Sequence, residues 1–261
     1  MSADNIRFIH ITDGVLSQEQ VSALAAISDY THRDHHLLPA SVASLEQSYL
    51  AGKAILALSP EGAWAGFIRL SPLFDNSLKY KLAAEYRGIH AIPDVYEMGT
   101  AVTNPELRQN GVSGEARYKL LLNNQELIQG GGLVMGTTKD AIVLHILQNK
   151  LGPRLGLNFS FTRHPNLSML EALTCVCEHP VGQGVHISET CTQRVEPQNI
   201  VLIENIVEQI KSGAKVQGTE KGCCLYVHDI QRAVSINQSL LNVFGSQQNF
   251  IDALRSIRYY E

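Results

Sequence analysis

Apolar and polar residues alternate along the chain with two different periods, and the switches between these periods divide it into strands and helices. A period of two, or a short apolar run, predicts strands at residues 6–11, 54–58, 63–70, 96–103, 133–137, 157–162 and 223–227. A period of about 3.6 predicts one helix that begins after Ser17. It predicts further helices at residues 41–50, 115–129, 141–151, 167–177, 200–212, 230–244 and 247–259. This alternation predicts an α/β fold.

Turn and breaker residues set the limits of these elements. The clearest signal is Ser59-Pro60-Glu61-Gly62, which predicts a hairpin between the second and third strands. The polar run T-H-R-D-H-H at 31–36 predicts a loop, and Gly152 with Pro153 is expected to end the helix that Asp140 caps. Residues 71–94 form a long connection of mixed character, a kind of segment that is often functional.

One stretch, residues 96–114, combines a strand, a polar turn and the start of a helix. A buried strand at 96–103 leads into Asn104-Pro105 and then into R-x-x-G-x-S-G, from Arg108 to Gly114. The N-terminus of a helix presents free backbone N–H groups and the positive end of the helix dipole, so this stretch predicts a phosphate-binding turn. Its spacing matches neither the dinucleotide fingerprint G-x-G-x-x-G nor a P-loop.

Composition narrows the class of protein. With 261 residues the chain can bury a large core in one or two domains. A net charge of −4 argues against a broad nucleic-acid or anionic-membrane surface, and no apolar run is long enough to span a bilayer. The five cysteines are expected to be reduced thiols in a cytoplasmic protein, with no bound metal.

The element order up to Thr162, β-α-α-β-β-β-α-β-α-β, together with this turn, resembles the GNAT superfamily of acyl-CoA-dependent N-acyltransferases. That family carries Q/R-x-x-G-x-G/A between its fourth strand and third helix, and Arg108, Gly111 and Ser113 occupy those places here. Ser113 departs from the usual Gly or Ala, and Gly114 beside it offers the same small size. The resemblance covers roughly residues 5–165 and implies a mixed, mostly antiparallel central sheet flanked by helices.

The resemblance also implies a co-substrate, acetyl-CoA or another acyl-CoA, and an acceptor, a small-molecule amine or a protein amine. The turn would bind the coenzyme A pyrophosphate, and the end of the strand would pair with the pantetheine arm. The residues so assigned are Ala101, Val102, Thr103, Arg108, Gln109, Asn110, Gly111, Val112, Ser113 and Gly114.

Catalysis by direct attack of an amine on the thioester needs a group that removes the amine proton. By resemblance Glu97 takes this role, because it lies where some family members carry a glutamate on the fourth strand. The segment V-T-N-P-E-L-R is one residue longer than the common V-x-P-E-x-R. If the extra residue lies in the turn, Tyr96 takes that place and Glu97 faces the other side of the sheet. A surface or salt-bridged Glu97 is the plain structural alternative.

Many family members use a tyrosine on the fourth helix as the acid for the leaving thiolate, and here that place holds Gln148. His145, one helical turn earlier, could replace it as a neutral imidazole, or it is a packed or solvated helix residue.

Three further groups of residues have plain explanations. His32, His35 and His36 fit a solvated loop, although in this family the loop borders the acceptor pocket. Arg117 and Lys119 fit a solvated helix face. A third group has no standard zinc spacing and fits structural thiols and nearby histidines: Cys175, Cys177, His179, His186, Cys191, Cys223 and Cys224.

The sequence therefore predicts an N-acyltransferase domain at 1–164 and an α/β extension of strand and helices at 165–261. Two alternatives remain. One is an N-acyl amino acid synthase or acyl-homoserine-lactone synthase type of enzyme that takes its acyl group from acyl carrier protein. The other is a non-catalytic module that binds acyl-CoA, which Gln148 favours.

Overall fold

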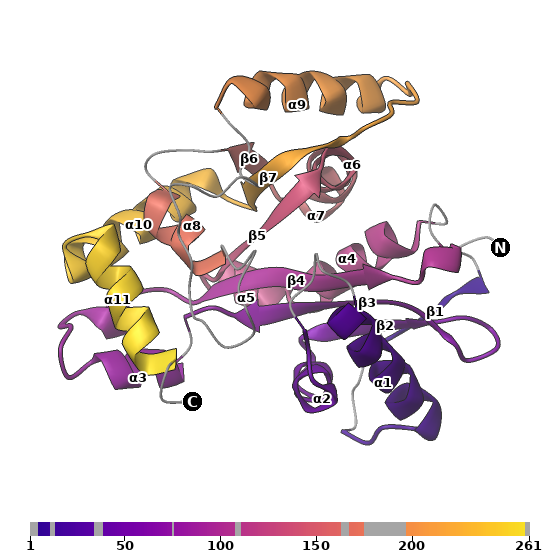
Figure 1. Cartoon of the computed structure of the whole chain (residues 1–261), viewed down its shortest axis with the longest axis horizontal. Coiled ribbons are helices and arrows are strands. Elements are labelled where there is room, and N and C mark those ends of the chain that lie inside the picture. Colours follow the sequence, from indigo (N-terminus) through magenta and orange to yellow (C-terminus); the bar gives the residue numbers. More distant parts are fainter. Residues whose placement is uncertain are drawn as a thin grey trace. The chain divides into compact units, whose positions relative to one another are not determined.

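The computed structural model of the chain describes residues 5–10, 14–33, 39–74, 76–107, 111–162, 167–174 and 197–258 (Figure 1). Its strands follow the order β1-β2-β3-β4-β5-β7-β6. The chain divides into two compact units. The first unit comprises Met1–Ser71 and Glu97–Gly130, and the second comprises Pro72–Tyr96 and Gly131–Glu261.

The first unit is a sheet with helices on both faces. Its strands are β1 (Arg7–Ile9), β2 (Ala54–Leu58), β3 (Trp64–Pro72) and β4 (Val95–Thr103), of which β3 and β4 also reach into the second unit. Its helices are α1 (Gln18–Arg33), α2 (Val42–Leu50), α4 (Val112–Asn123) and α5 (Gln125–Gln129), with a 3-10 turn at Pro105–Leu107. β1 and β3 both pair antiparallel with β2, so the predicted hairpin is confirmed.

Alternation along β2 and β3 sends side chains to opposite faces of this sheet. Leu56, Leu58 and Phe67 pack with α1 and α2 on one face, whereas Ala57 and Ala65 pack with Val112 of α4 on the other. Figure 1 shows α1 and α2 on one side of these strands and α4 on the other. All residues of β2 are buried because both faces are covered, which explains why its sequence is a continuous apolar run.

Hydrogen bonds from side chains fix the helix ends of this unit. Ser17 and Gln20 form a capping box, in which the Gln20 N–H donates to Ser17 Oγ at 3.2 Å and the Ser17 N–H to Gln20 Oε1 at 2.7 Å. The prediction of a loop from residue 31 was wrong at its start, since α1 continues to Arg33. Thr31 is polar yet fully buried, because its hydroxyl donates to the Ser28 carbonyl at 2.8 Å and accepts from the Ala40 N–H at 3.0 Å.

The second unit is built on β5 (Leu133–Asp140), β6 (Ser160–Thr162) and β7 (Glu220–Val227). β7 lies between β5 and β6 and is antiparallel to both, so the C-terminal part of the chain supplies a central strand. The helices of this unit are α3 (Asn76–Leu82), α6 (Ala141–His145), α7 (Gly152–Leu155), α8 (Ser168–Thr174), α9 (Pro197–Lys211), α10 (Ile230–Phe244) and α11 (Gln247–Arg258). Phe244 and Phe250 join α10 and α11 in one core with Leu133 and Val227.

Three helical segments differ clearly from the prediction. The connection at 71–94 contains α3 and a short 3-10 turn at Ile89–Ala91. The helix capped by Asp140 does not end at Gly152, because a π-helical segment at Ile146–Leu151 leads into α7, and Gly156 ends it at φ +67°. Pro153 lies in the first turn of α7, directly after the π-helical segment, and has no N–H to donate to a carbonyl of that segment.

The third difference concerns the helix after the turn. It begins at Val112 rather than at 115 and breaks at Asn124. The buried Asn124 side chain donates to the Leu120 carbonyl at 2.9 Å and accepts from Lys53 Nζ at 2.8 Å, which separates α4 from α5.

The α/β class with a mostly antiparallel sheet and flanking helices is confirmed. The division at residue 164 remains a prediction. Among the described residues, no helix has the length and apolar character that crossing a membrane requires.

Thr31→Val tests the link between α1 and the start of α2. The substitution keeps the shape of the side chain but leaves the buried Ala40 N–H without an acceptor, so the free energy of unfolding should fall by about 1–3 kcal/mol. Urea unfolding measures the loss. Ser22→Ala, on the exposed side of the same helix, should change stability by less than about 0.5 kcal/mol. Equal effects of the two substitutions would contradict the link.

Candidate functional site

The middle of β4 has an irregular backbone at Thr100. Among the described residues, Thr100 is the only non-glycine with a positive φ, at 46°. A β-branched side chain is costly in this left-handed region, so the surrounding contacts must hold it there. The buried positions of β4 are Val95, Met98 and Val102, and the three-residue step from Val95 to Met98 departs from strict alternation. A left-handed residue within a strand interrupts the regular alternation of side chains at that point.

Arg69 on β3 holds the irregular strand from one side. Its Nε donates to Thr100 Oγ1 at 3.0 Å, and its Nη1 donates to Ser44 Oγ at 2.7 Å and to the Ser44 carbonyl and Ser48 Oγ at 3.2 Å each. The guanidinium therefore joins β4 to α2. Partial burial lowers the pKa of Arg69, and the negative charge of Glu97 opposes this shift.

Glu97 lies three residues before Thr100 and interacts electrostatically with Arg69. Its side chain extends along β4 over Gly99, where an added Cβ would lie 3.2 Å from Glu97 Cδ. The plain interpretation of Glu97 as a charge-paired strand residue thus has a named partner.

Tyr96 belongs to the second unit, where it is half-buried. Burial, and then the charge of Asp94, raise the pKa of its phenol. Adjacent strand residues point to opposite faces, so Tyr96 and Glu97 cannot both occupy the catalytic place on β4.

The turn after β4 is tied to β3. The Asn104 N–H donates to the Ala65 carbonyl at 2.9 Å, and its side-chain amide donates to the Trp64 carbonyl at 2.9 Å. Ala101, Val102 and Thr103 form the end of β4, with Val102 buried toward α1 and α2. Arg108, Gln109 and Asn110, which were assigned to the pyrophosphate, lie outside the described residues.

The start of α4 carries the small residues of the motif. Gly111 caps the helix at φ +76°, a conformation that favours glycine. The first helical hydrogen bond runs from the Glu115 N–H to the Gly111 carbonyl at 3.0 Å, so the amides of Val112, Ser113 and Gly114 precede the helical ladder. A Cβ on Gly66 would lie 3.1 Å from Val112 Cγ1 and from the Val102 carbonyl oxygen, so only glycine admits this close approach to β4.

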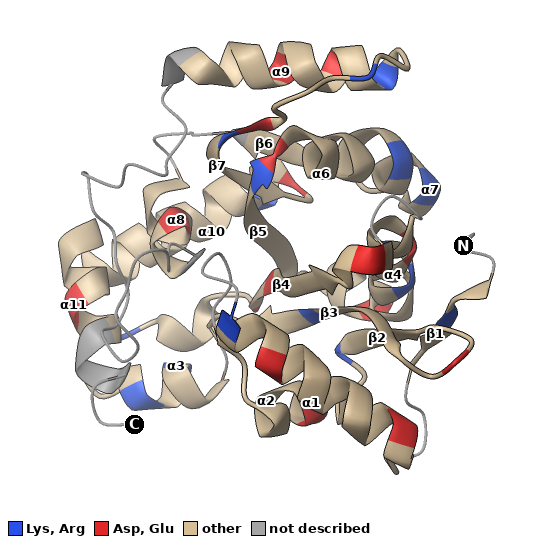
Figure 2. Cartoon of the chain, turned by 45° about the vertical axis from the view of Figure 1, so that its right-hand side comes forward, with Lys and Arg blue, Asp and Glu red and all other residues tan. Residues whose placement is uncertain are grey.

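The prediction that Arg117 lies on a solvated helix face was wrong. The sequence suggested a solvated face, but the Arg117 side chain is buried and its Nη1 donates to both the carbonyl and the hydroxyl of Ser113. A positive charge therefore lies within the first two turns of the helix. Lys119 is half-exposed and pairs with Glu115 at 3.6 Å, and Figure 2 shows residues of both signs on α4. The spacing of Ser113 and Arg117 by four residues was the signal for this contact.

His145 lies in the second unit, at the end of α6. It is buried, and its Nδ1 lies 3.4 Å from Asn149 Nδ2. Burial is the main cause that lowers its pKa, and Lys150 adds to the effect, which favours the neutral imidazole. Glu208 and Lys211 on α9 also act on it. The surroundings are those of a packed histidine, while Gln148 lies half-buried in the π-helical segment.

The remaining candidates give no metal centre among the described residues, in which no group of three His, Cys, Asp or Glu side chains could hold a metal. Cys223 and Cys224 are free thiols on β7, and burial raises the pKa of Cys224 to about 12, which makes it unreactive. His32 belongs to α1 and its Nδ1 lies 2.8 Å from the Ser28 carbonyl. The others lie outside the described residues: His35, His36, Cys175, Cys177, His179, His186 and Cys191.

Comparison with known proteins adds a likeness of fold. No protein-family model and no curated protein matches the chain. GNAT-family N-acetyltransferases of known structure are structural neighbours at low sequence identity. An acetyltransferase of that family from Listeria monocytogenes is 16% identical, with a TM-score of 0.37, and the match covers 61% of this chain and 90% of that one.

Two further neighbours match more of the chain. An agmatine N-acetyltransferase is 14% identical with a TM-score of 0.41, over 86% of this chain and 99% of that one. A Mycobacterium tuberculosis protein solved in complex with coenzyme A is 14% identical with a TM-score of 0.38, over 82% and 97%. At such low identity the likeness assigns no residue roles, so the roles of Glu97 and its neighbours rest on this chain's own contacts.

Substitutions at Thr100 test the left-handed backbone of β4. Both Thr100→Ala and Thr100→Gly remove the hydroxyl that Arg69 contacts, but only glycine relieves the positive φ. The glycine variant should therefore be more stable than the alanine variant by about 1 kcal/mol in urea unfolding. At Ala101, where φ is negative, glycine should instead cost about 0.5–1 kcal/mol. If alanine is the more stable residue at both positions, Thr100 is not left-handed.

Proposed function

We propose that the chain is an acyl-CoA-dependent N-acyltransferase, which transfers an acetyl or other acyl group from coenzyme A to an amine by direct attack. Two residues with left-handed backbone conformations, close together in the chain, carry this proposal. Thr100 lies within β4, and Gly111 lies at the start of α4. The first opens the strand for a ligand, and the second presents amides to an anion.

The residues at the start of α4 fit a diphosphate. The amides of Val112, Ser113 and Gly114 precede the helical ladder, and the buried Arg117 adds a full positive charge behind them. Glu115 opposes an anion here, but Lys119 pairs with it at 3.6 Å. Arg108, Gln109 and Asn110 of the motif would complete this anion site, and the backbone of Ala101, Val102 and Thr103 would hold the pantetheine arm.

Coenzyme A, when bound, supplies the acyl thioester. The protein must then remove a proton from the acceptor amine, since an ammonium has no lone pair for attack. Glu97 is suited to this step, directly or through a water, because a carboxylate can accept the amine proton and Glu97 lies on β4 three residues before Thr100. Thr100, held by Arg69, keeps the neighbouring backbone in the conformation that would polarise the thioester carbonyl.

We propose a small amine as the acceptor. The agmatine N-acetyltransferase among the structural neighbours acts on such a compound by its name. We also propose that the protein is cytoplasmic.

A non-catalytic acyl-CoA-binding module is the second candidate, favoured by Gln148 in the π-helical segment, where the family's acid would lie. Binding of acetyl-CoA without turnover of any amine would support it. Acyl carrier protein as donor would show as activity with acylated carrier protein and none with acyl-CoA.

Binding of coenzyme A should raise the melting temperature. At about 100 times Kd the ligand adds about 2.7 kcal/mol of stability, which for a chain of this size is a rise of roughly 5–10 °C. Gly111→Glu should abolish the rise, because it puts bulk and negative charge at the anion site. Gly213→Glu is the matched control, since Gly213 is an exposed glycine with φ +88° in the second unit. A rise that survives Gly111→Glu places the ligand elsewhere.

Two substitutions test which residue is the base. Both variants are assayed with the same acyl-CoA and acceptor amine, a pair on which the unmodified protein is active. Glu97→Gln keeps the shape but loses the basic carboxylate, so kcat should fall by about 10²–10⁴-fold while coenzyme A binding is unchanged. The deficit should shrink as pH rises, because more of the amine is already deprotonated. Tyr96→Phe serves as the comparison. Loss of rate in Tyr96→Phe alone would show that Tyr96, and not Glu97, occupies the catalytic place.

A further inference from the structure

Arg69 on β3 is half-buried, and four hydrogen bonds hold its guanidinium in place. Nε donates to Thr100 Oγ1, and Nη1 donates to the hydroxyl and the carbonyl of Ser44 and to the hydroxyl of Ser48. These contacts use the donors of two of the three guanidinium nitrogens. The third nitrogen, Nη2, has no hydrogen-bond partner among the described residues and is not shielded from solvent. The N–H donors of Nη2 are therefore open to a ligand.

The residues around Arg69 balance its charge only in part. Burial lowers the pKa of the guanidinium, and the negative charge of Glu97 opposes this shift without cancelling it. The two side chains interact electrostatically, but no ion pair joins Arg69 to any described carboxylate. A half-buried cation without a bound anion is costly, and an anionic group of a ligand at Nη2 would remove that cost.

Glu97 brings the opposite charge to the same stretch of β4. Its side chain lies over Gly99, where an added Cβ would be 3.2 Å from Glu97 Cδ, and Gly99 directly precedes Thr100, which Arg69 contacts. A carboxylate and a guanidinium thus lie beside two neighbouring residues of the strand. A simple amine would pair with Glu97 alone, and a dianion such as phosphate would be repelled by Glu97. A molecule with an amine and a carboxylate close together can pair with both groups.

We propose that the acceptor of the acyl group is an amino acid, whose carboxylate binds Nη2 of Arg69 and whose amine lies at Glu97. This inference rests on the proposed function and names its substrate class. The amine nitrogen attacks the carbonyl carbon of the thioester, so that a C–N bond forms and the C–S bond breaks. The amine gives up one proton and the leaving thiolate takes one up. The products are an N-acyl amino acid and the free thiol of coenzyme A.

Turnover of matched acceptors tests this substrate class. The full-length protein is incubated with acetyl-CoA and each of the common amino acids, and N-acetylated products are measured by mass spectrometry. The best amino acid is then compared with the amine that lacks only its carboxylate, as histidine is compared with histamine or arginine with agmatine. We expect kcat/KM for the amino acid to exceed that for the amine by about 10- to 100-fold, which corresponds to one hydrogen bond between charged groups.

The ratio of these two kcat/KM values separates binding of the carboxylate from a structural role of Arg69. Arg69→Gln should lower the ratio by about 10- to 100-fold, because only the amino acid loses a partner. Arg69→Lys keeps the charge and should retain part of the preference. Damage to the strand would instead lower both values and leave the ratio unchanged. The different basicities of the two acceptors cancel, because each acceptor is compared with itself across the variants.

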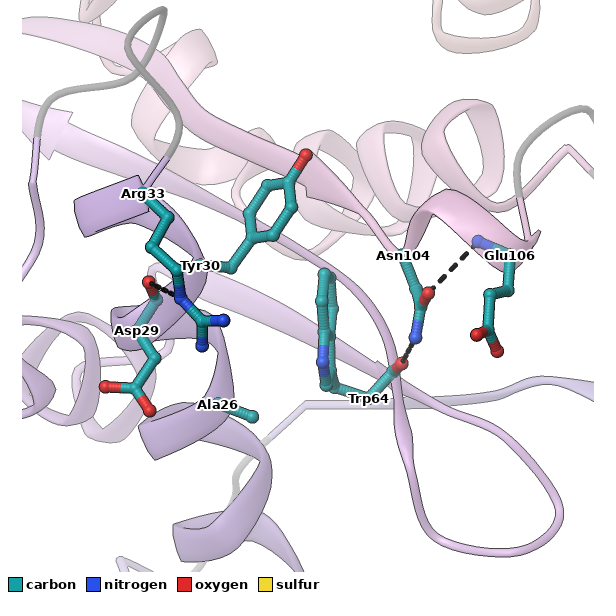
Figure 3. A pocket seen from close by; sticks show the side chains of 7 residues that line it. All are labelled: Ala26, Asp29, Tyr30, Arg33, Trp64, Asn104 and Glu106. Atoms are coloured by element: carbon teal, nitrogen blue, oxygen red, sulfur yellow. Dashed lines mark hydrogen bonds between the residues drawn. The ribbon is translucent and has the colours of Figure 1, made fainter.

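Arg33→Gln is the matched control, since Arg33 is an exposed arginine of the same unit. It lies at the end of α1, beside a pocket of about 460 Å³ that Tyr30 and Trp64 also line, and its Nε donates to the Asp29 carbonyl at 3.2 Å (Figure 3). The ratio should be unchanged in this variant.

The outcomes distinguish this inference from the proposed function. An equal loss with both acceptors in Arg69→Gln, or faster turnover of amines than of amino acids by the unmodified protein, would overturn the amino-acid acceptor and leave the acyltransferase in place. If no acceptor of either kind is acetylated, the proposed function fails, and calorimetry with the amino acids in the presence of coenzyme A tests the site directly. Saturable binding that Arg69→Gln removes would support the site, and absence of binding would overturn it.

Discussion

The contact between Arg69 and Thr100 is the interaction on which the site depends. A threonine at φ 46° is unfavourable by itself, and the hydrogen bond at 3.0 Å from a half-buried guanidinium holds it there. The same guanidinium donates hydrogen bonds to Ser44 and Ser48 on α2. It also interacts electrostatically with Glu97 on β4. One side chain thus joins the irregular strand to a helix and also interacts electrostatically with a carboxylate on that strand.

The helix that follows β4 is placed by a second set of constraints. Gly111 turns the chain into α4, and Gly66 lets the first residue of α4 lie against the sheet. Arg117 anchors the first turn through Ser113. Because the strand irregularity and the helix start are separated only by a short turn, ligand groups bound by the two would belong to one extended molecule. An acyl group, a pantetheine arm and a diphosphate in succession would satisfy that arrangement.

Sequence periodicity predicted most of the framework. The hairpin, the Ser17 and Asp140 caps and the last two helices follow from local rules, and each is confirmed. Features that depend on distant partners were not predicted. Arg117 looks like any exposed cation until Ser113 is placed beside it, and Thr100 reads as an ordinary strand residue because its φ depends on Arg69, 31 positions earlier. For the same reason the pocket at Trp64 has no signal in the sequence.

Amide hydrogen exchange, measured with and without saturating coenzyme A, tests the central claim most directly. If β4 and the start of α4 bind the co-substrate, the amides of 97–103 and 111–115 should exchange more slowly in its presence, because the ligand contacts their backbone. Gly111→Glu should remove this protection. Unchanged exchange across both segments under saturating ligand, or protection found only in other parts of the chain, would contradict the assignment of this site.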